Sequence, residues 1–209
     1  GTLINFMPDK SIFETVKFKA DVIRRRLKEL SYLNKGLKLK FHNKKDNEKL
    51  EEFYSDDGII GLLKDYNNNK DIAINEIFYF KGKKHDIEVE VAMQYVNDFA
   101  ENIISYCNNI NTVEGGNHVS GLRASFTRTI NQYAREIGAL KEKDENLEGK
   151  DIRNGMIAVI SVRHPNPQYE GQTKTKLGNP DIRGIVDEII SIEAQNYFDR
   201  NLEILKKVI

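Results

Sequence analysis

Residues 171–179 read Gly171-Gln172-Thr173-Lys174-Thr175-Lys176-Leu177-Gly178-Asn179. This polar loop carries two lysines between glycines, and it lies directly before a predicted helix that begins with Pro180 and Asp181. Lysine ammonium groups and free backbone N–H donors at a helix N-terminus can bind an anion, most often a phosphate. The glycines do not have the spacing of a Walker A loop. The residues alone leave two interpretations open, a phosphate-binding loop and a mobile surface loop.

The sequence on either side of this loop predicts a strand before it and a helix after it. Residues 156–162 are apolar and mostly β-branched, which favours a compact buried strand. After the loop, Asn179 is a favoured N-cap residue and Pro180 fits the first helical position. Apolar side chains then recur at helical spacing as far as Tyr197. The segment in between, residues 164–178, is the longest irregular stretch that the sequence predicts.

Strands are predicted ahead of a long helix in the middle of the chain. The strand-like runs are residues 76–80, 87–95 and 102–109, and the second alternates apolar with acidic side chains, as a sheet with one wet face does. An amphipathic helix follows at about 119–137, where Gly138 stops it. Strands grouped before helices, with some alternation late in the chain, indicate an α+β fold.

Shorter elements are predicted in the first part of the chain. A helix over about residues 18–30 ends near Gly36, which suits a left-handed cap. The other elements predicted there are a strand at 1–6, a half-exposed strand at 37–41, a hairpin turn at 44–47 leading to a strand around 50–54, and a helix at 59–66.

A second unusual segment is Asn111-Thr112-Val113-Glu114-Gly115-Gly116-Asn117-His118, which joins a predicted strand to the long helix. Its paired glycines permit backbone conformations that other residues resist. Asn117 is predicted to cap the helix, and a capping turn is sufficient to explain the segment. A catalytic role for His118 finds no partner acid or serine at a meaningful spacing. No cluster of histidine, cysteine, aspartate and glutamate has metal-ligand spacing, so no metal site is predicted.

Charge gives mixed indications about nucleic acid. Basic and acidic residues number 32 each, and the resulting net charge of zero does not favour a nucleic-acid protein. Bases nevertheless dominate residues 17–49, and Arg123, Arg128 and Arg135 lie away from the apolar stripe of the long helix. Such a face could meet a phosphate backbone or could simply be solvated. The residues alone leave both alternatives open.

Composition also bears on location. No apolar stretch approaches the roughly 20 residues needed to span a bilayer, so no membrane partner is predicted. The one cysteine, Cys107, excludes an internal disulfide and fits a reducing cytosol. Its apolar neighbours predict a buried structural thiol rather than a nucleophile. A cytoplasmic location is therefore expected.

Three segments of the sequence resemble the B subunits of bacterial type IIA topoisomerases, the family of DNA gyrase and topoisomerase IV. They are residues 26–36, 111–118 and 171–179, and the resemblance runs over essentially the whole chain. Asn117 stands where the family usually has threonine, and Leu122 where it usually has phenylalanine; both departures predict local repacking only. Details of the second and third segments favour the gyrase branch, and the equivalent domain of topoisomerase IV is the alternative.

The resemblance implies an α+β fold similar to the second domain of ribosomal protein S5. That fold is a mostly four-stranded mixed sheet with helices and a left-handed βαβ crossover. The resemblance further implies that residues 1–209 form the transducer domain of an ATP-dependent type II DNA topoisomerase, an isomerase. The ATPase domain that precedes a transducer and the TOPRIM domain that follows it are then expected to be absent, and the fragment alone is expected to be inactive.

The resemblance also implies roles for individual residues. Lys174 and Gln172 would contact the γ-phosphate of ATP, with Lys174 as the main electrostatic sensor and Gln172 holding the terminal phosphate or the attacking water. The cofactors would be ATP and Mg²⁺, bound mainly by the ATPase domain. Arg123 would face the transported DNA, and Arg128 matches that role less closely.

The partners that the resemblance implies are double-stranded DNA, the gyrase A subunit and the protein's own ATPase and TOPRIM domains. It also implies a homodimer of B subunits within an A2B2 complex. A rival of a different class is a stand-alone S5-like module that binds RNA or protein, which the near-zero net charge disfavours.

Overall fold

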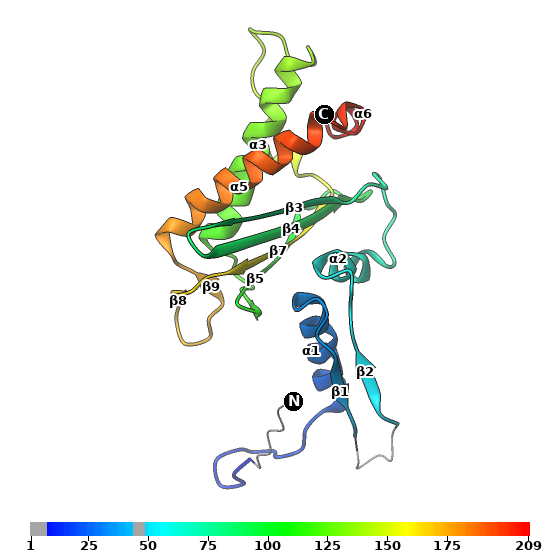
Figure 1. Cartoon of the computed structure of the whole chain (residues 1–209), viewed down its shortest axis with the longest axis vertical. Coiled ribbons are helices and arrows are strands. Elements are labelled where there is room, and N and C mark those ends of the chain that lie inside the picture. Colours follow the sequence, from blue (N-terminus) through cyan, green and yellow to red (C-terminus); the bar gives the residue numbers. More distant parts are fainter. Residues whose placement is uncertain (1–7, 44–48) are drawn as a thin grey trace. The chain divides into compact units, whose positions relative to one another are not determined.

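The structure is a computed structural model that describes residues 8–43 and 49–209 (Figure 1). The chain divides into two compact units, Gly1–Asp56 and Asp57–Ile209. The helices and strands are, in chain order, α1 (Ala20–Leu33), β1 (Leu39–Phe41), β2 (Glu51–Phe53), α2 (Ile59–Asn67), β3 (Phe78–Lys84), β4 (Ile87–Tyr95), β5 (Asn102–Cys107), β6 (Ile110–Asn111), α3 (Asn117–Glu136), α4 (Gly149–Ile152), β7 (Met156–Arg163), β8 (Tyr169–Glu170), β9 (Lys176–Leu177), α5 (Pro180–Phe198) and α6 (Leu202–Val208).

The first unit consists of one helix and one antiparallel pair of strands. α1 is followed by Gly36 at φ +83°, the left-handed conformation that the sequence predicted for this glycine. β1 and β2 pair antiparallel, and the Nε of Arg24 on α1 donates to Glu51 on β2 at 2.8 Å. The predicted turn at 44–47 and the predicted strand at 1–6 lie outside the described residues.

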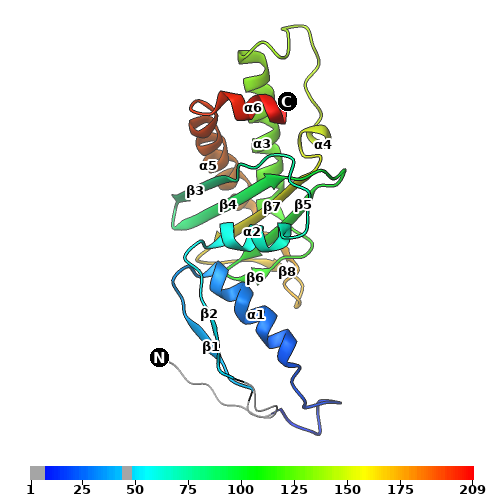
Figure 2. The same cartoon turned by 90° about the vertical axis from the view of Figure 1, so that its right-hand side faces the viewer.

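The second unit is built on a five-stranded mixed sheet with strand order β3-β4-β7-β5-β6. β5 and β7 run parallel, and the other neighbours are antiparallel. α3 and α5 pack together on one face of the sheet, and α2 packs on β4 and β7 from the other face (Figure 2). The sheet therefore lies between two helical layers, which explains why most of β4 and all but the last residue of β7 are buried.

The core of this unit centres on Phe198, at the end of α5, whose side chain is 0% exposed. Its ring centroid lies 5.9 Å from that of Phe78 on β3 and 5.8 Å from that of Tyr133 on α3. Phe126 and Tyr197 complete the aromatic cluster at 6.4 Å and 5.6 Å. Tilted aromatic pairs at such separations contribute packing beyond simple area burial. The cluster fixes both long helices to the sheet.

The four-stranded sheet expected from the resemblance is wrong, because the observed sheet has a fifth strand, β6. The sequence predicted one strand over 102–109. Asn108 and Asn109 instead adopt φ values of +47° and +65°, as a tight hairpin turn requires. The chain reverses there, so β5 ends at Cys107, which is buried as predicted.

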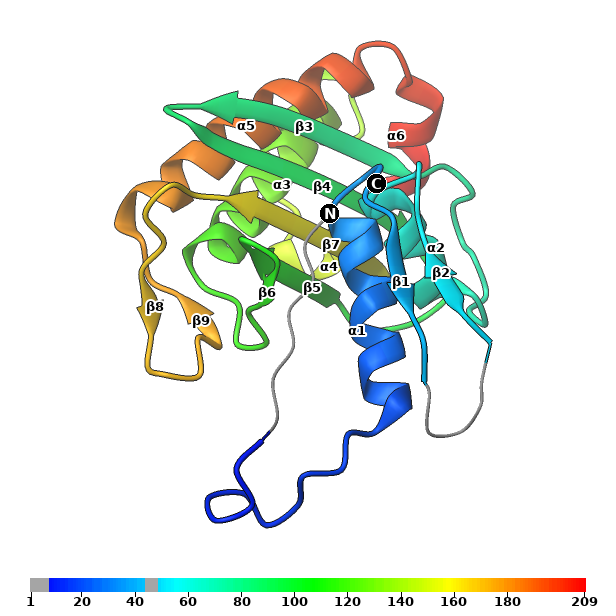
Figure 3. The same ribbon diagram turned by 60° about the horizontal axis from the view of Figure 1, so that its bottom comes forward.

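The predicted irregular stretch 164–178 is also more ordered than expected. It contains β8 and β9, an antiparallel pair in which Tyr169 lies opposite Leu177. Figure 3 shows this hairpin extending from the sheet beside β6. No helix in the described ranges is both long and apolar enough to cross a membrane.

Candidate phosphate-binding loop and arginine groove

The candidate site begins with the tip of the β8–β9 hairpin, residues 171–176, which we call the lysine loop. Gln172 and Lys174 are both exposed there. Lys174 adopts φ +56°, and its Nζ lies 5.7 Å from the centroid of the Tyr169 ring. Within the described part of the chain, neither side chain forms a hydrogen bond or an ion pair. Lys176 differs, because its Nζ lies 3.1 Å from a carboxylate oxygen of Glu170.

Tyr169 provides a fixed aromatic ring for a cation–π contact with Lys174. The Tyr169 hydroxyl donates to the carbonyl oxygen of Cys107 at 2.9 Å, which holds the ring against β5. A cation over an aromatic ring at an exposed site gains only about 0.5–1 kcal/mol. A phosphate group could therefore draw the ammonium away from the ring at little cost. Sequence reasoning missed this contact, because it depends on the hairpin that brings Tyr169 under the loop.

The lysine loop is bonded to the segment that precedes α3, so the two unusual segments of the sequence meet in space. Glu114 N–H donates to the Thr175 carbonyl at 2.9 Å, and Leu177 N–H donates to the Gly115 carbonyl at 3.0 Å. The Thr175 hydroxyl also donates to the Glu114 carboxylate. These bonds join the loop directly to the segment that leads into α3.

Gly116 and Asn117 complete this junction, and Asn117 does not cap the helix as predicted. The N-cap is Gly116, at φ +135°, and a Cβ there would lie 2.2 Å from the Leu177 carbonyl oxygen. Asn117 is the first helical residue, and its Nδ2 donates to the carbonyls of Gly178 at 3.0 Å and Asn179 at 2.9 Å. Asn117 therefore ties the start of α3 to the start of α5.

Asn179 occupies the N-cap position of α5, but its side chain does not cap the helix. It is 3% exposed, and its Oδ1 accepts the Gln168 N–H at 2.6 Å while its Nδ2 donates to the Asn166 carbonyl at 3.1 Å. The side chain therefore closes the base of the β8–β9 hairpin. The sequence placed the residue correctly and assigned its side chain to the wrong backbone groups.

His118 is part of a buried polar chain and is not presented to a ligand. The Thr112 hydroxyl oxygen lies 3.0 Å from the Ser105 carbonyl oxygen and 3.1 Å from His118 Nε2. His118 Nδ1 is buried and has no hydrogen-bond partner among the described residues. Burial lowers the pKa of His118 to about 4, because the charged imidazolium would lose its hydration there.

The neutral His118 predicts a loss of stability in acid. Unfolding exposes the imidazole and restores its ordinary pKa of about 6.5, so the unfolded chain takes up a proton between pH 6.5 and 4 while the folded chain does not. The stability associated with neutral His118 is present above pH 6.5 and is lost as the pH falls towards 4. Linkage gives a loss of about 2 kcal/mol in the free energy of unfolding at pH 5. Urea denaturation of wild type and His118→Gln across this range is expected to show a flatter profile for the variant, and parallel profiles would contradict it.

The predicted DNA-facing arginines lie on α3, and both are ion-paired. The Nε of Arg123 lies 3.0 Å and 3.1 Å from the two carboxylate oxygens of Glu101. Arg128 donates from Nη1 to Asp187 on α5 at 3.0 Å. Sequence reasoning missed Arg153, whose Nε lies 2.7 Å from Glu101, because nothing in the linear pattern joins residues so far apart.

Two hollows border these residues. A pocket of about 400 Å³ at the start of α3 is lined by Glu114, Ser120, Arg123 and Lys176, among others, so it adjoins both the lysine loop and the first arginine. A larger groove of about 770 Å³ runs along α3, and we call it the arginine groove. Its charged lining residues are Arg123, Arg128, Arg135 and Arg153.

Two solved structures show the likeness of this fold to known proteins. The crystal structure of the 43K ATPase domain of Thermus thermophilus gyrase B, in complex with an aminocoumarin, is 34% identical with a TM-score of 0.84, and the match covers 96% of this chain and 54% of that one. The topoisomerase IV ATP binding domain of Francisella tularensis, in complex with a small molecule inhibitor, is 24% identical with a TM-score of 0.79, covering 96% and 55%. The second likeness supports the fold alone.

Residues 58–209 match the family model described as DNA gyrase B, and the chain belongs to this family. The DNA gyrase B protein of Clostridium acetobutylicum is 45% identical over 210 residues, which cover 100% of this chain and 33% of that protein. The gyrase B protein of Streptococcus pneumoniae is 43% identical over 211 residues, with the same two shares. The chain thus spans about one third of the length of these curated relatives. The predicted preference for the gyrase branch is confirmed at the level of the family.

The structural match corrects two expectations. The chain matches the ATPase domain structure of gyrase B, so the S5-like transducer fold with a left-handed crossover is wrong as the fold class. The expectation that the ATPase domain is absent is wrong as well, because 96% of the chain aligns with a structure of that domain. The motifs behind the resemblance lie in one loop and at two helix termini. They identify the family without defining the domain that surrounds them.

Proposed function

We propose that this chain senses the γ-phosphate of ATP through Lys174 and Gln172 and couples ATP binding and hydrolysis to DNA strand passage by a type II topoisomerase. The observation that carries the proposal is the exposed Lys174 ammonium, which has no carboxylate partner in the described chain and lies on a loop bonded to the start of α3. Lysine suits a terminal phosphate because it is a compact charge with three donors. The Gln172 amide can add a donor to a phosphate oxygen or orient a water.

The coupling follows from a difference in contacts between nucleotide states. With ATP bound, the lysine loop gains a charged partner, and after phosphate release that partner is gone. Movement of the loop pulls on the backbone bonds from Glu114 and Leu177, and on the amide of Asn117 that bridges α3 and α5. Those two helices cover one face of the sheet, so a small displacement of the loop shifts a packed layer.

The remaining parts of the ATP site are proposed to lie outside this chain. The chain covers 54% of the gyrase B ATPase domain structure that it matches. The described residues include no group of three histidine, cysteine, aspartate or glutamate side chains that could hold a metal ion. We assign the Mg²⁺ ligands and the general base to the rest of the protein. This chain alone is then expected not to hydrolyse ATP.

The further partners are proposals of the same kind. We propose that Arg123 and Arg128 face double-stranded DNA, and that the gyrase A subunit, a TOPRIM domain and a second copy of the B protein in an A2B2 complex complete the enzyme. A cytoplasmic location is part of this proposal. The boundaries of the transducing region, predicted as residues 1–209, stay a prediction.

Hydrogen exchange on the intact gyrase B protein tests the sensing role. With a non-hydrolysable ATP analogue, amide exchange in the lysine loop is expected to slow by about tenfold or more relative to ADP, because the γ-phosphate orders the loop. The turn at His85 and Asp86, which also has positive φ and joins two antiparallel strands, β3 and β4, is the matched control and should not change. Equal protection by ADP would show that the loop responds to nucleotide in general and would contradict the proposal.

A further inference from the structure

The Lys174 ammonium has an aromatic partner and no acidic one in the described chain. Its Nζ lies 5.7 Å from the centroid of the Tyr169 ring. The two carboxylates that border the lysine loop are occupied by other groups. Glu170 pairs with Lys176 at 3.1 Å, and Glu114 accepts a hydroxyl of the loop. The ring is therefore the group that holds this ammonium when no phosphate is bound.

The Tyr169 ring is anchored to the sheet and cannot follow the ammonium. Its hydroxyl donates to the Cys107 carbonyl at 2.9 Å, and its backbone lies opposite the buried Leu177. The side chain also packs against the hydrophobic core of the second unit. Burial raises the pKa of the Tyr169 hydroxyl, so the phenol stays protonated and the ring stays neutral. The contact thus joins a cation to a neutral ring that is fixed in place.

The lysine side of the contact can move. Lys174 is exposed at the tip of the hairpin, on a flexible four-carbon stem. Its backbone is at φ +56°, and its N–H is 3.4 Å from the carbonyl oxygen of Gly171, itself at φ +73°. A bond of that length closes the turn only weakly. An ammonium that turns towards a phosphate therefore leaves the ring behind, and the cation–π contact is broken.

A neutral ring suits this position better than a carboxylate would. A carboxylate beside the loop would repel an approaching triphosphate, because like charges interact over several ångströms. The ring attracts the ammonium without that repulsion. At an exposed site it favours the bound position by about two- to fivefold. This preference places the ammonium between nucleotides, and a charge-assisted hydrogen bond to phosphate is strong enough to overcome it.

We propose that Tyr169 is a positioning residue that holds the Lys174 ammonium whenever no γ-phosphate is present. ATP must displace the ammonium from the ring, whereas ADP leaves it there. The inference rests on the proposed function, in which Lys174 senses the γ-phosphate, and adds the group that competes for that lysine. Because the competition affects only the nucleotide with a third phosphate, Tyr169 sets how strongly the site prefers ATP to ADP.

The test is equilibrium binding of a non-hydrolysable ATP analogue and of ADP to the intact gyrase B protein. Tyr169→Leu removes the ring, and it is expected to tighten binding of the analogue by about two- to fivefold while binding of ADP stays the same. A gain confined to one nucleotide cannot arise from misfolding. Tyr169→Phe keeps the ring and should bind both nucleotides like the wild type. In a Lys174→Ala background, Tyr169→Leu should alter neither affinity.

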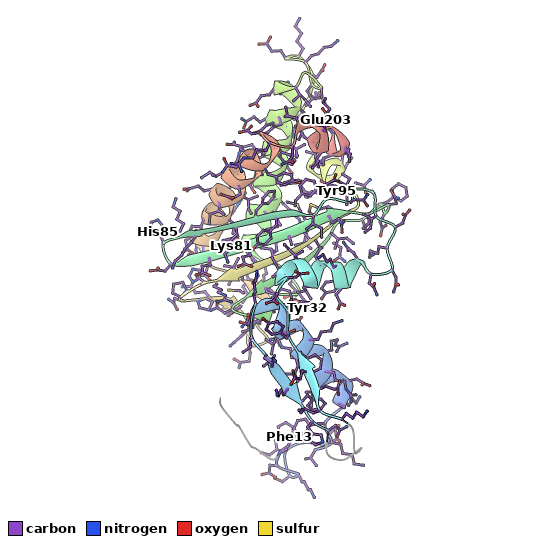
Figure 4. The ribbon with its side chains drawn as sticks, turned by 45° about the vertical axis from the view of Figure 1, so that its right-hand side comes forward. Phe13, Tyr32, Lys81, His85, Tyr95 and Glu203 are labelled. Carbon is purple, nitrogen blue, oxygen red and sulfur yellow. The ribbon has the colours of Figure 1, made fainter. Side chains whose placement is uncertain are left out.

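Tyr79→Leu is the matched control for removing a tyrosine ring. Tyr79 is an exposed tyrosine of β3, two residues before Lys81, which Figure 4 labels. The Lys81 ammonium lies 2.6 Å from a carboxylate oxygen of Glu90, so removal of the Tyr79 ring releases no cation towards the nucleotide. This variant should change neither affinity.

Phenylalanine analogues with increasing numbers of ring fluorines at position 169 give a second measurement that preserves the shape of the ring. Fluorine weakens the negative face of the ring that attracts a cation. Each added fluorine should therefore tighten binding of the ATP analogue further and leave ADP unaffected. This series tests the inference even if Tyr169→Leu folds poorly, and a flat series would overturn it.

The remaining outcomes separate this inference from the function beneath it. If Lys174→Ala weakens binding of the analogue but Tyr169→Leu leaves it unchanged or weaker, the ring does not compete and the inference alone is overturned. Equal tightening for ADP, or an effect that persists without Lys174, would also overturn it, because the effect would then not involve the γ-phosphate. If Lys174→Ala leaves the preference for the analogue over ADP unchanged, the proposed sensing role itself fails.

Discussion

ATP turnover by the intact gyrase B protein is expected to fall by about 10²-fold or more when Lys174 is replaced by alanine. A preorganised donor that stabilises charge on a transferring phosphate contributes on the order of 10²–10³ in rate. Lys174 forms no ion pair with a carboxylate among the described residues, and its cation–π contact with the Tyr169 ring is weak. Most of its electrostatic attraction is therefore available to the nucleotide. The loss should fall on kcat, because the terminal phosphate changes most in the transition state.

Lys176→Ala is the matched control for this prediction. Both lysines belong to the same exposed loop, but Lys176 is paired with Glu170 at 3.1 Å, and an exposed pair of this kind contributes about 0–1 kcal/mol. Its removal should alter turnover by a few-fold at most. Unchanged turnover for Lys174→Ala, with nucleotide binding and folding retained, would mean that the loop is only a connector. Equal losses for the two variants would instead indicate a general effect of loop charge.

The sequence identified the local chemistry of this region better than its context. The apolar and β-branched runs predicted β4 and β7 closely, and Gly36 and Gly138 both take the positive φ that ends a helix. These features depend on neighbours in the chain. β6 was missed because the Asn108-Asn109 turn reverses a run that reads as one strand. The preference of the two asparagines for a turn overrode the preference of the surrounding residues for a continuous strand.

The site was predictable only in its parts. The lysine loop and the paired glycines each stood out in the sequence, but their pairing through Gly116 and Leu177 depends on the fold of the whole sheet. Glu101 and Arg153 could not be identified from the sequence, because they form an ion pair only when the fold brings the end of α4 close to the start of β5. The S5-like fold class was wrong for a related reason, since motifs in loops identify a family and not the fold that surrounds them.

Gly116→Ala is expected to lower the free energy of unfolding by about 4 kcal/mol or more, which is large for a single methyl group. The added Cβ would lie 2.2 Å from the carbonyl oxygen and 2.6 Å from the amide nitrogen of Leu177, and both atoms are backbone that cannot rotate away. The residue also sits at φ +135°, where a Cβ is strained whatever the space. Either the unit unfolds more readily, or the lysine loop separates from α3.

Gly138→Ala is the matched control for Gly116→Ala, because it adds backbone strain without bringing a Cβ close to another atom. Gly138 has φ +76° at the end of the same helix, and nothing lies within 4 Å of the position its Cβ would take. Its replacement should therefore show the strain alone, about 1 kcal/mol. Urea denaturation measures both variants, and turnover of the intact protein shows whether separation of the loop from α3 removes the Lys174 effect. Equal losses of stability would mean that the Gly116–Leu177 contact is not tight in solution, and the coupling through that junction would then lose its structural basis.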